Sequence, residues 1–338
     1  MSATGTLRTF PLGFPWETPD PFLFCAYHSD RYPAGNDEQG PAASLSGRSL
    51  GNDFTVKDGW RMYHGRTVPG FPAHPHCGFE TVTLVTRGYC DHSDSLGAAA
   101  RFGRGDAQWI TTGRGLQHAE MFPLLRQDAG NTLELFQIWL NLPARSKRVN
   151  PHFRMLWEDE IPVVDTRGAR IRLVAGTVAD YSAPRPAPDS WAADPANDVI
   201  IAQIDLEPQR SWTLPMASAD VRRMLYHFEG GGLQIGDTNL PPDYGVEADS
   251  AEYAIRAGES GARLLWLQGR PIGEPVAQYG PFVMNTHAEI EQAMQEFRTT
   301  QFGGWPWRHP DPVHGPEPVR FARFPDGTEI RKAASKPG

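Results

Sequence analysis

Short runs in which apolar and polar residues alternate dominate the chain and predict β-strands. The clearest run is Leu133–Leu142, where apolar side chains alternate with mixed positions, as in a half-buried strand. A second run, His74–Val85, ends in β-branched and aromatic residues, which pack well on a pleated surface. Further strands are expected at Pro21–Tyr27, Arg61–Gly65, Tyr89–Ser93, Ala107–Thr111, Ile171–Ala175, Val199–Leu206, Arg223–Glu229, Leu233–Ile235 and Ala262–Gln268.

Two segments depart from this strand pattern. Asp30–Asp53 is rich in Gly, Ser, Pro, Asn and Asp, so we expect an exposed loop there. Residues 286–297 have helical spacing, and Thr286 with Glu289 three residues later has the spacing of a capping box. The sequence therefore predicts one helix, close to the C-terminus.

Length and the order of the strands indicate two β domains. The chain has 338 residues, which exceeds the usual size of a single core. A polar segment, residues 146–159, separates two series of strands. We expect one domain at 1–160 with a loop insertion at about 30–53, a second at 161–302 that includes the helix, and a Pro/Gly-rich tail without regular structure at 303–338.

Composition narrows the classes of protein further. The 34 glycines and 31 prolines favour many turns and therefore many short strands. A net charge of −8 gives no basic field for nucleic acid or anionic lipid, so neither partner is expected. Without a signal-peptide pattern or a membrane-spanning run, we expect a cytoplasmic protein. Three cysteines without a CxxC pair indicate reduced thiols: Cys25, Cys77 and Cys90.

One stretch concentrates side chains that can bind a metal ion. His74, His76 and Glu80 share a face if they lie on one strand, because strand side chains alternate, and His118 and Glu120 share a face in the same way. The sequence therefore predicts a metal pocket from two strands. The remaining histidines that we considered are expected to be ordinary core or surface residues: His92, His152, His227, His287, His309 and His314.

Two or three imidazoles with one carboxylate suit a first-row transition ion and leave coordination positions open for a substrate and dioxygen. A closed structural zinc site would instead use the cysteines. These residue types accept Fe, Mn, Co, Ni, Cu or Zn, and the spacing leaves open which of the two glutamates is a ligand.

Several longer motifs resemble the pirin family of the cupin superfamily. They are HPHCGFETVT, HSDSLG, GDAQWITTGRGLQHAEM and GPFVMNTHAEIEQA, in this order between about Pro21 and Phe302. The resemblance implies an all-β bicupin, with two antiparallel β-barrel (jelly-roll) domains and a short C-terminal helix. It also implies a metal in the N-terminal domain and none in the C-terminal domain, whose strands contain His227 but no His-x-His pair.

Carried over residue by residue, the resemblance assigns the metal ligands to His74, His76, His118 and Glu120, and makes Glu120 the candidate catalytic base. Glu80 then becomes a partner that orients an imidazole. Cys77 departs from the family, which commonly has arginine there. The loop at about 30–53 is a second departure, since it is an apparent insertion before the motif.

The resemblance also implies a function. Pirin relatives include quercetin 2,3-dioxygenases, so we expect one metal ion, Fe(II) first among the alternatives, with a flavonol-like aromatic and dioxygen as substrates. The alternative is a metal-binding, redox-sensing regulatory protein with a protein partner and no turnover. A different cupin reaction on another small molecule is a third possibility.

Overall fold

A computed structural model describes residues 6–332 of the chain, which separates into two compact units. Of the described residues, unit 1 contains 6–26, Ile138–Pro143 and Asp159–Gly273, and unit 2 contains Tyr27–Gln137, Ala144–Glu158 and 274–332. Strands make up most of the regular structure, and the only α-helix among the described residues lies near the C-terminus. The expected all-β class with one short C-terminal helix is therefore confirmed.

The two units do not follow the expected division at residue 160: the segment before Tyr27 and Ile138–Pro143 belong to unit 1, and the segment from Glu274 belongs to unit 2. Strand β1 (Leu7–Pro11) pairs antiparallel with β20 (Tyr244–Ala248), so the N-terminal strand belongs to unit 1. Helix α1 (His287–Thr300) packs against β24 (Phe282–Met284) and belongs to unit 2. These differences arise from contacts between segments far apart in sequence, β1 with β20 and Val283 with the Cys77 carbonyl oxygen, which the linear order of the chain does not reveal.

Unit 1 contains two antiparallel sheets, ordered β1-β20-β17-β22-β15-β12-β11 and β16-β21-β18-β19. Its core includes Leu225 and Trp266, and the ring of Trp266 packs 5.8 Å from that of Trp212. Its other strands, with the short hairpin β13-β14, are β11 (Val163–Asp165), β12 (Ala169–Ala175), β13 (Thr177–Val178), β14 (Tyr181–Ser182), β15 (Ile200–Leu206), β16 (Ser211–Leu214), β17 (Arg222–Gly230), β18 (Leu233–Ile235), β19 (Thr238–Leu240), β21 (Tyr253–Ala257) and β22 (Ala262–Gly269).

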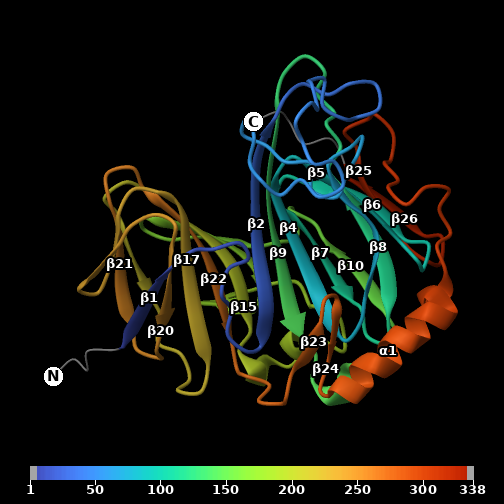
Figure 1. Cartoon of the computed structure of the whole chain (residues 1–338). Coiled ribbons are helices and arrows are strands. Elements are labelled where there is room, and N and C mark those ends of the chain that lie inside the picture. The colour runs from blue at the N-terminus through green and yellow to red at the C-terminus, as the bar shows by residue number, and fades with distance from the viewer. Residues whose placement is uncertain (1–5, 333–338) are drawn as a thin grey trace. The chain divides into compact units, whose positions relative to one another are not determined.

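Unit 2 is organised around an antiparallel six-stranded sheet, ordered β26-β25-β6-β5-β8-β3, and a five-stranded sheet, ordered β10-β7-β4-β9-β2. Strands β10, β7, β4 and β9 lie side by side in Figure 1. The strands of unit 2 are β2 (Phe22–Tyr32), β3 (Gly70–His76), β4 (Phe79–Arg87), β5 (Tyr89–Asp94), β6 (Ala99–Gly103), β7 (Asp106–Thr111), β8 (Leu116–Met121), β9 (Asn131–Asn141), β10 (His152–Leu156), β23 (Ala277–Tyr279), β24, β25 (Arg320–Arg323) and β26 (Glu329–Lys332), where β2 begins and β9 ends in unit 1.

The predicted strand His74–Val85 is two strands rather than one. β3 ends at His76 and β4 begins at Phe79, and the two strands lie in different sheets. Gly78 between them has φ +87°, and a Cβ there would lie 1.9 Å from the carbonyl oxygen of Val283, so this position requires glycine. Because of this break, the side-chain alternation of β3, which places His74 and His76 on one face, does not extend to Glu80.

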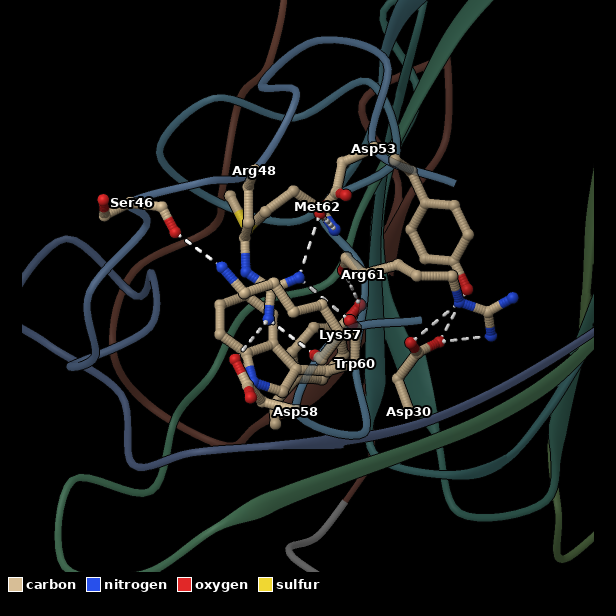
Figure 2. Close-up of polar contacts among 11 residues, drawn as sticks. Asp30, Ser46, Arg48, Asp53, Lys57, Asp58, Trp60, Arg61 and Met62 are labelled. Carbon is tan, nitrogen blue, oxygen red and sulfur yellow. Dashed lines mark hydrogen bonds and ion pairs between the residues drawn. The ribbon is translucent and has the colours of Figure 1, made fainter. Parts of the chain in front are cut away.

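The expectation of an exposed loop at Asp30–Asp53 is wrong at both of its ends. Strand β2 continues to Tyr32, and Asp30 is fully buried. Arg61 donates to both carboxylate oxygens of Asp30 at 3.0 Å. Figure 2 draws this pair and also Asp53, which accepts hydrogen bonds from Arg48 and from the backbone N–H of Met62. Buried charged pairs therefore hold the segment to the unit.

The candidate strand Arg61–Gly65 is also wrong, because only isolated bridges form there. Tyr63 pairs with Asp53 and with Gly70, and its φ of +56° interrupts an extended backbone. Arg48 fixes the neighbouring turn: its guanidinium lies 3.3 Å from the ring centroid of Trp60 and donates to the Trp60 carbonyl oxygen at 3.0 Å (Figure 2).

The tail contains regular structure, contrary to expectation. β25 pairs with β26 and with β6, so it extends the six-stranded sheet. Arg320 on β25 donates to the buried carboxylate of Asp106 at 2.6 Å. Arg101 also donates a hydrogen bond to the carbonyl oxygen of Glu317 in the tail. These ties explain how a segment rich in proline and glycine is ordered.

The predicted helix is confirmed as α1, drawn in orange in Figure 1. Thr286 and Glu289 form the expected capping box, since the Thr286 side chain accepts from the Glu289 N–H and the Glu289 side chain accepts from the Thr286 N–H. Ile290 and Ala293 are buried on its inner face. Among residues 6–332, no helix combines the length and the apolar character needed to cross a membrane.

Candidate metal centre

Three histidines converge inside unit 2. β3 and β8 pair antiparallel with His74 opposite His118, which puts their side chains on one face of the sheet. His76 shares that face because it lies two residues after His74. A ligand nitrogen from each of the three rings lies within 4.8 Å of the other two, and the Nε2 atoms of His74 and His76 are 3.1 Å apart. The structure thus brings together three of the predicted ligands.

Hydrogen bonds and burial set the protonation state of this cluster. The Nδ1–H of His74 donates to the carbonyl oxygen of Pro72 at 2.8 Å. Burial lowers the pKa of His74 to about 4, so at neutral pH its Nε2 carries a free lone pair. Burial also lowers the pKa values of His76 and His118 well below their ordinary value. Neutral imidazoles are the form in which histidine binds metals.

The cluster fits a transition-metal ion. Bonds of about 2.0–2.1 Å from nitrogen to one ion place neighbouring nitrogens roughly 3.0–3.4 Å apart, which is the spacing of the His74 and His76 Nε2 atoms. Both ring nitrogens of His118 are buried and have no hydrogen-bond partner among the described residues. A bound ion would satisfy one of them and offset the cost of burying it.

Glu120 lies near His118, is not part of the group formed by the three histidine nitrogens, and is held by other residues. Its Oε2 is 3.9 Å from the Nε2 of His118 and accepts a hydrogen bond from Gln137 Nε2 at 2.5 Å. The Thr83 hydroxyl lies 2.8 Å from Glu120 Oε1 and 2.7 Å from Gln137 Oε1. Burial raises the pKa of Glu120, and the hydrogen bonds from Thr83 and Gln137 oppose that shift.

Sequence reasoning missed Thr83 and Gln137. Both lie on strands of the five-stranded sheet, whereas Glu120 lies on the six-stranded sheet. The alternation of β4 and β9 does mark the face on which each side chain lies. It does not indicate that these faces meet Glu120.

Glu80 is placed differently from the sequence expectation. It lies on β4, in the five-stranded sheet, and is fully buried. Its Oε1 accepts a hydrogen bond from the Thr111 hydroxyl at 2.6 Å, and Thr111 is its partner in the β4–β7 register. Its expected role of orienting an imidazole stays a proposal.

His92, expected to be an ordinary histidine, lies next to the cluster. It is opposite Glu120 in the β5–β8 register, and its ring centroid is 5.6 Å from that of His118. Its Nε2 lies 3.2 Å from Asp94 Oδ2, and both side chains are fully buried. The HSDSLG motif therefore places a His–Asp pair on the same face as the candidate ligands.

Cys77 directly follows the His-x-His pair and is buried. Its Sγ lies 3.4 Å from the carbonyl oxygen of Gly113. Burial raises the pKa of its thiol to about 11. All three cysteines are free and buried, as expected for reduced thiols.

Two family models match the chain. The pirin model matches residues 17–140, and the model of the pirin C-terminal cupin domain matches residues 201–303. The first match contains all four predicted ligands. The order of the two matches agrees with two cupin domains in one chain.

Individual relatives support the same grouping. A Pseudomonas aeruginosa protein provisionally named a quercetin 2,3-dioxygenase is 34% identical over 238 residues, covering 68% of this chain and 79% of the relative. A pirin-like protein of Caulobacter vibrioides is 34% identical, covering 69% and 80%. The crystal structure of a quercetin 2,3-dioxygenase from Acinetobacter baumannii superposes with a TM-score of 0.68 and 25% identity, covering 88% of this chain and 95% of that one.

Proposed function

This chain belongs to the pirin family of cupin proteins, and on that premise we propose that it is a metal-dependent dioxygenase that opens the ring of a flavonol-type aromatic. The observation that carries the proposal is the cluster of His74, His76 and His118 beside the buried Glu120. The likeness to the Acinetobacter baumannii quercetin 2,3-dioxygenase supports the substrate class.

The proposed ligands are His74, His76, His118 and Glu120, with Fe(II) as the first candidate ion and Mn, Co, Ni, Cu or Zn as alternatives. When bound, such an ion supplies Lewis-acid chemistry for a deprotonated hydroxyl and a route for reaction with dioxygen. The side chains of the cluster provide neither the Lewis-acid chemistry nor the reaction with dioxygen. The chain itself contributes binding, orientation and proton transfer.

Glu120 is the proposed base. Its carboxylate accepts the proton of the flavonol hydroxyl. Gln137 and Thr83 hold the two carboxylate oxygens, which fixes their direction. The reaction joins one flavonol with one dioxygen, breaks the central ring and releases one carbon monoxide, so that its atoms balance.

The test combines elemental analysis of protein purified without added metal with oxygen-consumption measurements over a set of flavonols. We expect flavonol loss, oxygen uptake and carbon monoxide release in equal amounts, abolished in His118→Ala. His309→Ala is the matched control because His309 is exposed. A protein that carries stoichiometric metal and turns over no flavonol would refute the dioxygenase and leave the redox-sensing regulatory alternative.

A further inference from the structure

One cavity in unit 2 is lined by none of the proposed metal ligands. It has a volume of about 910 Å³. Its floor is apolar and buried, and consists of Tyr32, Phe122, Leu124 and Leu133. Its more exposed lining carries charge, at Arg87, Arg104, Arg126 and Glu158. We call it the arginine-rimmed pocket.

Backbone hydrogen bonds preform one wall of this pocket. The Leu124 N–H donates to the carbonyl oxygen of Gln39 at 2.9 Å, and the Gly35 N–H donates to that of Arg126 at 2.7 Å. Asn131 closes the same loop, since its side chain accepts from the Arg126 N–H and donates to the Arg126 carbonyl oxygen, both at 2.9 Å. A wall tied at both ends loses little entropy when a ligand binds.

The turn that carries Arg104 is fixed as well. Its tip adopts a left-handed conformation, with φ +59° at Arg104. The Gly105 N–H donates to the carbonyl oxygen of Val85 at 2.7 Å, and the Gly103 N–H donates to the side chain of Asp106 at 3.0 Å. Arg104 is therefore presented from a rigid turn.

The rim has an excess of positive charge in a protein whose net charge is −8. The lining contains three arginines and one acidic residue, Glu158. Arg87 forms no ion pair among the described residues. Arg126 lies 3.9 Å from Asp128, with both side chains largely exposed, and such surface pairs contribute little. The local excess of guanidinium groups favours an anionic ligand.

We propose that the arginine-rimmed pocket binds a small amphipathic anion, with an apolar body on the buried floor and a carboxylate or sulfonate group at the rim. The proposal does not rest on the dioxygenase function, since no proposed metal ligand lines the pocket. Aromatic packing connects the two sites: Phe122 lies 6.1 Å from Phe71, whose ring lies 6.4 Å from that of His74.

The test uses two fluorescent probes with the same apolar body, 1-anilinonaphthalene-8-sulfonate and the uncharged N-phenyl-1-naphthylamine. The double variant Arg87→Gln, Arg104→Gln of the full chain should bind the sulfonate probe about tenfold more weakly, or worse, because two charge-assisted contacts are lost. Its affinity for the uncharged probe should not change. Thr132→Trp, which fills the pocket, should weaken both probes.

Two controls make the result decisive. Arg210→Gln removes an exposed arginine of unit 1 and should leave both affinities unchanged. His118→Ala should also leave them unchanged, and loss of binding in that variant would place the probe at the metal centre and overturn the proposal. An unchanged sulfonate affinity in the double arginine variant, with native thermal unfolding, would overturn it too. If the double arginine variant bound both probes equally more weakly, the two arginines would not recognise the anionic group, and the proposal would be overturned.

Discussion

The Nε2 atoms of His74 and His76 lie 3.1 Å apart, while the Nδ1–H of His74 is already used by the carbonyl oxygen of Pro72. Because His74 is neutral near pH 7, its Nε2 presents a lone pair to His76. Two buried nitrogens at this separation are stabilised by a shared proton or by a cation. The Pro72 contact thus orients His74 towards metal binding.

Metal content follows directly from this geometry. We expect about one first-row ion per chain, and His74→Ala or Glu120→Ala should weaken binding by at least about 10–100-fold, the loss seen even for residues that only support a ligand. His309→Ala should bind as the native protein does. Unchanged metal content in both ligand variants, measured by elemental analysis after dialysis, would contradict the assignment.

The stability of the metal-free protein should depend on pH through His74. Its pKa is lowered from 6.5 to about 4, chiefly by burial, so the unfolded chain takes up a proton that the folded chain does not. The free energy of unfolding should therefore be highest above about pH 6.5 and fall towards pH 4, by up to about 1.4 kcal/mol per pH unit from this residue. Urea unfolding at pH 7 and pH 5 measures the change. His74→Gln should show a smaller fall in the free energy of unfolding between these pH values. An equal fall in that variant would show that other groups cause the pH dependence.

Thr83 and Gln137 should matter to metal binding although neither is a proposed ligand. Thr83→Val and Gln137→Leu each remove a polar contact of Glu120 and should lower metal affinity about tenfold. The matched control is Thr81→Val, on the same face of β4, because the Thr81 hydroxyl is buried without a hydrogen-bond partner among the described residues. Equal effects of Thr81→Val and Thr83→Val on metal titrations would show that packing alone is responsible.

Arg48 should stabilise the segment between β2 and β3. It is buried over Trp60 and donates to the Lys57 carbonyl oxygen at 2.7 Å and to Asp53 at 3.1 Å. Lysine lacks the planar fork that makes these contacts together, so Arg48→Lys should cost about 2–3 kcal/mol. Limited proteolysis should then cut this segment faster. Arg66→Lys, at an exposed arginine of the same segment, should show no such increase.

Cys77 should be unreactive in the folded protein. Its pKa of about 11 leaves almost no thiolate at neutral pH, and its side chain is buried. Labelling with a chromogenic disulfide should be slow in buffer and rapid in denaturant, with and without bound metal. Fast native labelling that disappears in Cys77→Ser would instead identify a reactive thiol.

Local alternation was sufficient to group the histidines. His74 and His76 share a face because they are two residues apart on β3, and His118 and Glu120 share a face on β8 for the same reason. The capping box of α1 is local too, since Thr286 and Glu289 are one turn apart. Each of these features could be predicted from the sequence because it depends on the backbone geometry of a single element.

Other features depended on the pairing of distant strands. The left-handed turn at Gly78 moved Glu80 into the other sheet, and the register of β5 with β8 placed His92 opposite Glu120. The contact of Gln137 with Glu120 required strands from two sheets to face each other. The sequence by itself determined the β class, the helix and the faces shared by His74 with His76 and by His118 with Glu120, because side-chain periodicity is a local property. Tertiary structure alone decided which side chains hold Glu120, because such contacts are set by sheet pairing and core packing between segments far apart in the chain.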